Sequence, residues 1–350
     1  MKALIAMSGG VDSSVAAYLM KQQGYDCLGM TMRLFDPDVE QEKSCCTSDD
    51  IKDAEHVCDV LNIPFEVENF TDHFKREVID RFVLAYETGT TPNPCIDCNR
   101  YIKFKRFFDM AKQLDYDYIV TGHYARVEQK DGKFYLKKAK DLSKDQSYVL
   151  YSLTQQQLQH IKFPLGELSK DEVRQIAENQ DFINADKPDS QDICFVVNGD
   201  YASVIEHYSN KKYPEGDFVD LQGNVLGKHK GIIRYTIGQR KGLGLSLPES
   251  LYVCKKDVEN NKVVLCKNEQ LFSSEVYVKD FNWILGQAPE HPVKVSAKIR
   301  YNQVEKPATA TVLENGIVHL AFDEPQRAIA AGQSAVVYDG DIVLGGGIII

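Results

Sequence analysis

The strongest constraint on the fold is an alternation, over residues 1–122, of short apolar runs with stretches of helical periodicity. The runs LIAM, DCLGMTM, FEVENF and DYIVTG each fit a buried strand. Strands that alternate with helices form βαβ units and a mainly parallel sheet covered on both faces. Ligands bind such sheets at the carboxyl ends of the strands. The sequence therefore predicts an α/β domain with helices over residues 13–23, 48–61, 71–87 and 99–114.

The pattern changes after Tyr124. Asp131-Gly132 predicts the turn of a β-hairpin, and Ser169 to Glu172 is a capping box that opens a helix ending near Gln180. From about Asn210 onward, β-branched runs such as GIIRYTIG and KVVLC recur between glycine, asparagine and aspartate turns. This half of the chain is predicted to be all-β, with two small sheets or barrels. We expect boundaries near residues 205 and 275.

Composition narrows the class of protein. The 350 residues carry a net charge of −10, which argues against a general nucleic-acid coat protein but leaves an RNA enzyme with local basic patches possible. No apolar run is long enough to span a bilayer, and the first strand is too short for a signal peptide, so we expect a cytoplasmic protein with no membrane partner. The sequence offers two candidate basic patches, and each is equally compatible with a plain solvated face. The first consists of Lys133, Lys137, Lys138, Lys140 and Lys144, and the second of Lys294, Lys298 and Arg300.

The nine cysteines do not predict a disulfide framework, because their number is odd and no secretion signal precedes them. Cys58 lies on an apolar helical stripe and is predicted to be core. Cys27, Cys254 and Cys266 lie in strand-like runs, and the same interpretation applies to them. The pair Cys45–Cys46 stays undecided, so attention falls on the remaining cysteines, Cys95, Cys98 and Cys194.

The segment from Ser8 to Ser14, SGGVDSS, follows the first strand and opens the first helix. Glycines let the backbone approach an anion, and the helix start offers unpaired N–H groups and a positive dipole end. Asp12 is a candidate ligand for Mg²⁺. A Walker A loop is excluded because its lysine is missing. The plain alternative is a glycine turn with a serine N-cap, but the segment resembles the PP-loop of the ATP pyrophosphatase superfamily, which adenylates a substrate oxygen.

The segment from Thr91 to Asn99, TPNPCIDCN, places Cys98 close to the start of a helix. The helix dipole, with Arg100 and Lys103, favours the thiolate form of this cysteine, which is the form that sulfur chemistry requires. A CxxC segment equally fits a redox pair or half of a zinc site. Structural zinc is the weaker option, because the sequence contains no second CxxC.

Cys194 lies in the segment PDSQDICF. Taken in order, SGGVDSS, NPCIDCN and DSQDICF resemble the tRNA-specific 2-thiouridylase family, and TGHYA, KDQSYVL, IGQRKGL, KIRYNQ, AGQSAV and LGGG resemble further blocks of it. The similarity covers essentially the whole chain, whereas lysidine or GMP synthetases would share only the first block. The resemblance implies a PP-loop domain over residues 1–204, a small β domain over 205–275 and a tRNA-contacting β-barrel over 276–350.

The resemblance also implies roles for individual residues and a substrate, the wobble uridine of tRNAs for lysine, glutamate and glutamine. Cys98 would be the catalytic thiol and Cys194 the carrier of a persulfide sulfur. ATP would meet Ala6, Met7, Ser8, Gly9, Gly10, Val11, Asp12, Ser13, Met32 and Gly122. The tRNA would meet Asn93, Pro94, Cys95, His123, Lys144, Asp145, Gln146, Arg300, Tyr301 and Gln333.

One position departs from the family pattern. Many members have aspartate where this chain has Cys95, and here Asp97 follows instead. Cys95, Cys98 and Cys194 are therefore also candidate ligands for a 4Fe–4S cluster that would bind hydrosulfide. Persulfide and cluster chemistry both stay open, and a persulfide relay protein, a cysteine desulfurase or hydrosulfide is the expected sulfur donor.

Two other functions compete with this hypothesis. A PP-loop ligase that adenylates a small metabolite explains the first motif but leaves the three cysteines and the β-rich half unused. A non-catalytic RNA-binding module with a structural metal would use the β-rich half alone. Release of pyrophosphate that depends on tRNA separates these functions from a sulfurtransferase.

Overall fold

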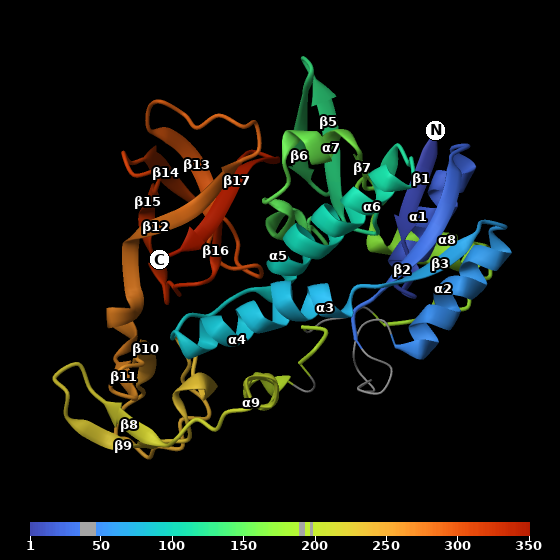
Figure 1. Cartoon of the computed structure of the whole chain (residues 1–350). Helices are drawn as coiled ribbons and strands as arrows, with labels where there is room; N and C mark the ends of the chain where they lie inside the picture. Colours follow the sequence, from blue (N-terminus) through green and yellow to red (C-terminus); the bar gives the residue numbers. More distant parts are fainter. Residues whose placement is uncertain (36–46, 189–192, 197–198) are drawn as a thin grey trace.

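The computed structural model describes residues 1–35, 47–188, 193–196 and 199–350 (Figure 1). The N-terminal part is built on a five-stranded parallel sheet in the order β3-β2-β1-β4-β7. The chain runs outward from β1 through β2 to β3 and then crosses to β4 on the other side of β1, so the carboxyl ends of β1 and β4 form a topological switch point, where ligands bind in such sheets. The strands are β1 (Lys2–Ala6), β2 (Asp26–Arg33), β3 (Phe65–Asn69), β4 (Tyr118–Val120) and β7 (Ile161–Lys162).

Helices cover both faces of this sheet, as the apolar runs predict. Ala3 and Ile5 of β1 belong to the core under α1, α2 and α8, whereas Leu4 belongs to the opposite core with α3, α4 and α6. The capping box predicted at Ser169 is present, with its hydroxyl accepting from the Glu172 N–H. The helices are α1 (Val11–Gln22), α2 (Ser48–Val60), α3 (Thr71–Phe74), α4 (Asp80–Glu87), α5 (Pro94–Asp97), α6 (Phe107–Gln113), α7 (Gln155–Gln159) and α8 (Lys170–Asn179).

Two helices of this part contain π-helical turns. Residues 71–87 form one continuous helix, as predicted, whose middle Lys75–Ile79 is π-helical between α3 and α4. The helix predicted over 99–114 begins earlier, at Pro94, and its segment Cys98–Arg106 is π-helical between α5 and α6. Such turns are frequent at functional sites. Cys98 is the first residue of the second one.

The predicted hairpin is present, with Asp131 at φ +51° and Gly132 at φ +75° in its turn. Its strand β6 also pairs with β17, at Lys137 and Ile342, and so attaches the hairpin to the C-terminal sheet. Pairing of β12 with both β15 and β17 closes six strands into a barrel. The strands are β5 (Ala125–Lys130), β6 (Lys133–Lys138), β12 (Phe272–Trp283), β13 (Val293–Lys298), β14 (Lys306–Val312), β15 (Val318–Arg327), β16 (Ser334–Asp339) and β17 (Ile342–Ile349).

The middle part is a four-stranded sheet in the order β10-β11-β8-β9. The prediction of a strand in GIIRYTIG is wrong: Ile232–Arg234 forms a 3₁₀ turn, because Gly231 at φ +104° and Gly238 at φ +88° interrupt the extended chain. The predicted boundary near residue 205 lies within α9 and stays a prediction. The elements are α9 (Tyr201–Ser209), β8 (Gly216–Val219), β9 (Val225–His229), β10 (Tyr252–Asp257) and β11 (Lys262–Cys266), with further 3₁₀ turns at Ser147–Leu150 and Asn268–Leu271.

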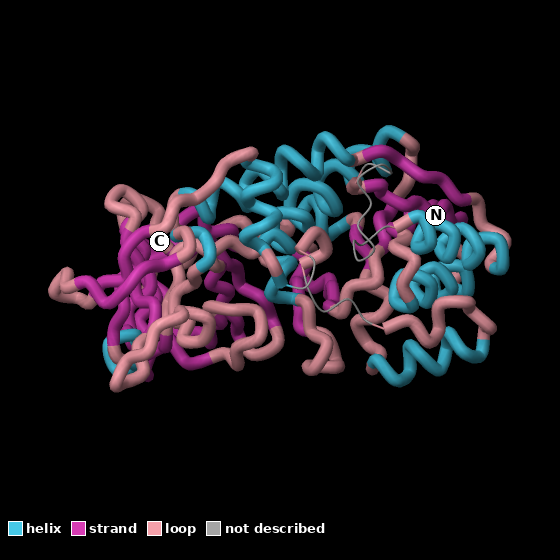
Figure 2. Tube along the Cα trace, turned by 90° about the horizontal axis from the view of Figure 1, so that it is seen from below, coloured by secondary structure: helices cyan, strands magenta, loops and turns pink. Residues whose placement is uncertain are grey.

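The molecule is elongated, with the barrel at one end, the parallel sheet at the other and helices between them (Figure 2). One apolar core runs through the three parts, because buried side chains of the sheet, the middle part and the barrel belong to the same cluster. Within the described ranges, every helix is too short or too polar to cross a membrane.

Candidate active site

The loop from Ser8 to Gly10 joins β1 to α1 at the switch point of the sheet. Gly9 has φ +72°, and a Cβ there would lie 2.3 Å from the carbonyl oxygen of Asp50 at the start of α2, so only glycine fits. Gly10, the N-cap of α1, has no side chain to cover the first N–H groups of the helix. The Ser13 hydroxyl accepts from the Ser8 N–H at 3.2 Å and donates to the Gly10 carbonyl at 2.9 Å. This geometry meets the requirements of an anion cradle.

The neighbouring strand ends bring Met32 and Gly122 to the loop. A Cβ on Gly122 would lie 2.8 Å from the Asp12 carbonyl carbon and 2.9 Å from the Ser13 nitrogen, so the residue after β4 packs against the first turn of α1. Met32 is buried at the end of β2, and Thr31 donates its hydroxyl proton to the Met7 carbonyl at 2.8 Å. The predicted ATP-contacting residues therefore lie together around one loop.

Asp12, in the first turn of α1, accepts two hydrogen bonds from distant parts of the chain. Its Oδ1 accepts from the Tyr124 hydroxyl and from Lys170 Nζ, both at 2.8 Å. Lys170 is the first residue of α8 and is nearly buried. Sequence reasoning located this helix start but did not connect its lysine with the loop.

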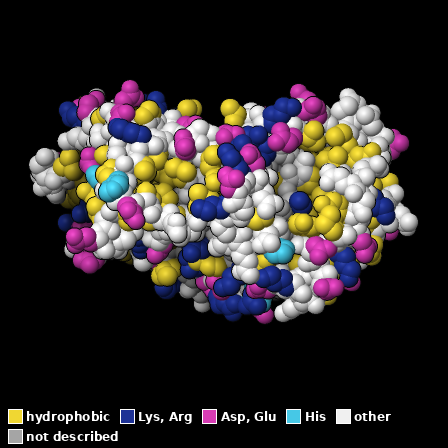
Figure 3. All heavy atoms as spheres, turned by 90° about the horizontal axis from the view of Figure 1, so that it is seen from above, with side chains coloured by type: hydrophobic (Ala, Val, Ile, Leu, Met, Phe, Trp, Pro, Cys, Tyr) yellow, Lys and Arg dark blue, Asp and Glu magenta, His cyan; other side chains and the backbone are white. Residues whose placement is uncertain are grey.

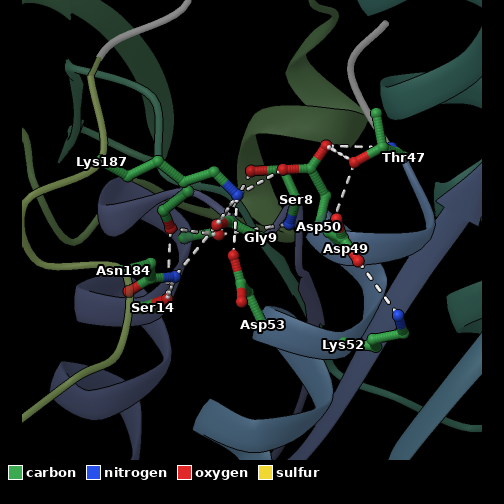
Figure 4. Close-up of polar contacts among 12 residues, drawn as sticks. Ser8, Gly9, Ser14, Thr47, Asp49, Asp50, Lys52, Asp53, Asn184 and Lys187 are labelled. Carbon is green, nitrogen blue, oxygen red and sulfur yellow. Dashed lines mark hydrogen bonds and ion pairs between the residues drawn. The ribbon is translucent and has the colours of Figure 1, made fainter. Parts of the chain in front are cut away.

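A second lysine reaches the loop from the segment after α8 (Figure 4). Lys187 Nζ donates to the Gly9 carbonyl at 3.2 Å and to Asp53 at 2.8 Å, and it also pairs with Asp50. Burial opposes charge on Asp50, but hydrogen bonds from Lys187 and Thr47 outweigh it and lower the pKa of this carboxyl. Burial likewise opposes charge on Lys187, whose pKa is nevertheless raised by Asp50 and Asp53. Asn184, buried beside Lys187, donates to the same Gly9 carbonyl at 3.0 Å and to Ser14 Oγ at 2.9 Å.

The CxxC segment forms the start of the second π-containing helix. The Asn93 side chain accepts from the Cys95 N–H at 3.2 Å and caps α5, with Pro94 at its first position. Cys95 is exposed and Cys98 is half-buried. Asn99 is buried and donates to the Val149 carbonyl at 3.2 Å, which fixes the helix next to Cys98.

Both cysteine segments are anchored on consecutive residues of α4. Arg81 Nε lies 3.4 Å from Asp97 Oδ2, next to Cys98 in the chain, and burial raises the pKa of Asp97 even though Arg81 opposes this shift. The ring of Phe195, which follows the half-buried Cys194, packs edge-to-face on Phe82 at 5.1 Å. One helix therefore holds both segments.

Candidate metal ligands do not come together in the described parts of the chain. No three His, Cys, Asp or Glu side chains there are gathered so that they could hold a metal ion. Cys95, Cys98 and Cys194 thus do not form a ligand set for a 4Fe–4S cluster in this structure. Cys45, Cys46 and residues 189–192 of the motif before Cys194 lie outside the described residues.

Family comparisons agree along the whole chain. Residues 1–198 match the profile described as "tRNA methyl transferase HUP domain", 202–267 the "tRNA methyl transferase PRC-barrel domain" and 273–349 the "Aminomethyltransferase beta-barrel domain". A tRNA-specific 2-thiouridylase MnmA of Clostridioides difficile (strain 630) is 51% identical over 99% of this chain and 98% of its own length. The chain belongs to the tRNA-specific 2-thiouridylase family.

Other members of the 2-thiouridylase family are nearly as similar. A protein of Thermoanaerobacter sp. (strain X514) is 50% identical and one of Clostridium perfringens is 49% identical, each over 99% of this chain, with 97% and 98% of their own lengths covered. Among solved structures, a 4-thiouridine synthetase–RNA complex with bound ATP aligns at TM-score 0.36 and 15% identity, over 59% of this chain and 50% of that one.

Two of the residues that the resemblance assigns to tRNA join parts of the molecule. Gln333 Nε2 donates to the carbonyls of Thr91 and Pro92 at 2.9 and 3.2 Å and so ties the barrel to the loop before Cys95. Arg300 Nη2 donates to the Ala328 carbonyl at 2.6 Å and lies 3.4 Å from the Ile237 carbonyl of the middle part. Burial, with Arg327 nearby, lowers the pKa of Arg300.

Other assigned residues are also engaged within the protein. His123 is only 7% exposed, and burial, with Lys103 nearby, lowers its pKa well below the ordinary value, so its ring is neutral at pH 7. Asp145 accepts from the Ala139 and Ser147 N–H groups, and Gln146 Oε1 accepts from the Tyr124 N–H at 2.9 Å. An RNA contact by these residues stays a prediction.

Tyr301 and Lys144 are both partly accessible to solvent. Tyr301 is 37% exposed beside the Tyr148 ring. Burial raises its pKa, and the neighbouring Asp145 and Cys95 add to this shift. Lys144 is half-buried in the loop that Asp145 organises.

Some lysines of the patches predicted from sequence are paired with acidic side chains. Lys137 pairs with Glu128 and Asp341, and Lys138 pairs with Glu305. Lysine and arginine side chains gather in the middle of the face seen in Figure 3, but acidic side chains are interspersed among them. This face therefore does not present one continuous basic surface.

Proposed function

We propose that the chain catalyses the ATP-dependent 2-thiolation of a uridine in tRNA. The observation that carries this proposal is the anchoring of two cysteine segments on consecutive residues of α4, Arg81 and Phe82, in the same domain as an anion cradle. A metabolite ligase has no use for the two thiols. The family relatives, named tRNA-specific 2-thiouridylases, support the choice of tRNA as substrate.

The first step of the proposed reaction activates the base. The uracil O2 attacks the α-phosphorus of ATP, the N3 proton leaves, and the bond to the bridging oxygen breaks so that pyrophosphate departs with its electron pair. N–H groups at the start of α1 stabilise the charge on the leaving group. The oxygen atoms of this chain that would meet Mg²⁺ carried with ATP belong to Ser8, Asp12 and Ser13. When bound, this ion would neutralise charge on pyrophosphate.

The second step transfers sulfur. The terminal sulfur of a persulfide on Cys194 attacks C2 of the adenylated base, and AMP leaves. The Cys98 thiolate then attacks Sγ of Cys194, the bond to the transferred sulfur breaks, and that sulfur stays on C2 as the thiocarbonyl. The resulting Cys98–Cys194 disulfide is reduced by a dithiol before the next turnover.

The finer assignments belong to the same proposal. The target is the wobble uridine of tRNAs for lysine, glutamate and glutamine. Its base must leave the anticodon stack to reach the site, and this unstacking costs roughly a few kcal/mol. A persulfide relay protein or a cysteine desulfurase loads Cys194: the Cys194 thiolate attacks the outer sulfur of the donor persulfide, and the donor cysteine leaves as a thiolate. Hydrosulfide would be the donor only in the cluster version, because it cannot form a persulfide without an oxidant. Residues 1–204 carry the chemistry, residues 205–275 form a small central β domain, and the barrel over 276–350 contacts the tRNA.

Release of pyrophosphate tests the proposal against its rivals. Purified protein is incubated with ATP and Mg²⁺, alone, with bulk tRNA, or with a mixture of small metabolites. We expect release only with tRNA. Release with metabolites but without tRNA would identify a metabolite ligase, and no release under any condition would identify a non-catalytic binding module.

A further inference from the structure

We infer that Asn184 and Lys187 are positioning residues for the phosphate loop. Although they are distant in sequence, their side chains fix the backbone of this loop, which its own glycines leave free to rotate. Both side chains donate to one carbonyl, that of Gly9, at 3.0 and 3.2 Å. We call these two residues the Gly9 clamp. The inference rests on the proposed use of ATP and adds residues that sequence motifs did not identify.

The clamp fixes the orientation of the peptide between Gly9 and Gly10. In a trans peptide the carbonyl oxygen and the following N–H point in opposite directions, and none of the described peptide bonds is cis. Holding the Gly9 oxygen against Asn184 and Lys187 therefore points the Gly10 N–H away from both donors. On that side an anion can accept a hydrogen bond from this N–H. Without the clamp, a glycine pair has more freedom to rotate this peptide than any other pair of residues.

The surroundings of the clamp make it specific rather than incidental. Asn184 is 2% exposed and its amide also donates to Ser14 Oγ at 2.9 Å, so one side chain binds the loop and the first turns of α1. Lys187 is held between Asp50 and Asp53 of α2, one helical turn apart. The Asp50 carbonyl oxygen also lies 2.3 Å from the position that a Gly9 Cβ would occupy. Three elements thus converge on the Gly9 peptide.

The charge of Lys187 is balanced by its acidic partners. A Walker A loop carries its own lysine beside the phosphates, and this loop does not. Lys187 places a cation 3.2 Å from the loop backbone, and Asp50 and Asp53 keep it charged, since both raise its pKa. Figure 4 shows the ammonium group between the loop and the two carboxylates. Because the two carboxylates offset this charge, the contribution of Lys187 to the cradle is its hydrogen bond to the Gly9 carbonyl.

Binding of three ligands separates positioning from a general loss of structure. Dissociation constants for ATP, pyrophosphate and adenosine are measured by equilibrium dialysis on the full chain, with the variants Lys187→Met and Asn184→Ala. Removing a donor from the clamp is expected to weaken ATP and pyrophosphate about tenfold or more, while adenosine changes by less than about twofold, because adenosine has no phosphate. Lys187→Arg, which keeps a donor for the Gly9 carbonyl and a cation for Asp50 and Asp53, is expected to recover most of the affinity.

Lys52→Met is the matched control. Lys52 lies on α2, the helix that carries Asp50 and Asp53, but its side chain is 72% exposed and pairs only with Asp49 among the described residues. It should bind all three ligands as the wild type does. If Lys187→Met does not fold, Asn184→Ala still tests the clamp, because it removes the other donor to the Gly9 carbonyl.

Unchanged ATP affinity in both clamp variants would overturn the inference, and so would an equal loss of adenosine and ATP. Failure of the proposed function gives a different pattern. The wild type would then bind ATP without thiolating tRNA, and the affinity differences among the variants would still support the clamp. A wild type that binds neither ATP nor pyrophosphate would contradict both.

Discussion

Gln333 of the barrel donates its amide proton to the carbonyl of Thr91, 2.9 Å away, across 242 positions of sequence. The Thr91 N–H in turn donates to the Ala331 carbonyl at 2.8 Å, and a Cβ on Gly332 would lie 2.9 Å from Thr91. The barrel loop and the approach to Cys95 thus fit together backbone to backbone. The barrel, which the family resemblance assigns to tRNA contact, therefore packs directly against the loop that leads into Cys95 and Cys98.

Gln333→Ala is expected to uncouple the barrel from the thiol segment. Two carbonyls lose their donor, which destabilises the docked loop by about 1–2 kcal/mol. The rate of thiolation should fall several-fold, while ATP affinity stays as in the wild type, because the phosphate loop is untouched. Single-turnover thiolation and ATP binding are measured side by side.

Gln129→Ala is the control for this variant, since Gln129 is exposed on β5. It should thiolate tRNA at the wild-type rate. Equal rates for Gln333→Ala and the wild type would show that the joint has no bearing on the chemistry.

Gly122→Ala is expected to damage the ATP site without unfolding the protein. The new methyl group would lie within 3.0 Å of the Asp12 backbone, so the first turn of α1 must shift away from its place at the switch point. We expect ATP affinity to fall about tenfold or more, because the N–H groups of this turn would no longer face the phosphates together. Titration with ATP measures the effect, and thermal unfolding confirms the fold.

Gly132→Ala provides the comparison. A Cβ there meets nothing within 4 Å, and only the positive φ of +75° opposes it, at a cost of about 1 kcal/mol. This variant should lose some stability but no ATP affinity. The prediction for Gly122 is wrong if the two variants bind ATP equally well.

Lys256 is expected to make stability depend on pH above neutrality. It is 9% exposed, lies 3.4 Å from the Thr90 carbonyl, and burial lowers its pKa to about 8 from the ordinary 10.5. Between these values the unfolded chain holds the proton that the folded chain has released, so stability rises with pH across this window. Lys256→Met should therefore be more stable at pH 7 by about 1–3 kcal/mol, and the gain should disappear near pH 10.5.

Urea unfolding at pH 7, 8.5 and 10 measures this difference. Lys255→Met, on the exposed side of the same strand, should give no pH-dependent gain. A constant difference between Lys256→Met and the wild type at all three pH values would mean that packing, and not the charge, is responsible.

Local signals predicted most of the fold. The strand before Ser8, the capping box at Ser169 and the turn at Asp131-Gly132 depend on residues close in sequence, and the structure confirms each of them. GIIRYTIG misled because its β-branched residues read as a strand, whereas the glycines at both ends have positive φ and turn the chain. The short strand β7 was also missed, since a two-residue strand carries no period.

The candidate site could be predicted only in part, for a similar reason. The glycine loop and the CxxC segment are contiguous motifs with their own local geometry. Asn184 and Lys187 reach Gly9 across 175 and 178 positions, and no local pattern marks a side chain for such a contact. The same holds for Lys170, whose place at a helix start was predicted but whose partner Asp12 was not.

The most direct measurement is mass spectrometry of tRNA nucleosides after incubation with ATP, Mg²⁺ and a sulfur donor. The wild type should convert uridine to 2-thiouridine, and Cys98→Ser and Cys194→Ser should each abolish the product while Cys254→Ser, altered in the middle sheet, retains it. Accumulation of 2-thiouridine by Cys194→Ser at the wild-type rate would contradict the account, because no persulfide on that residue could then carry the sulfur.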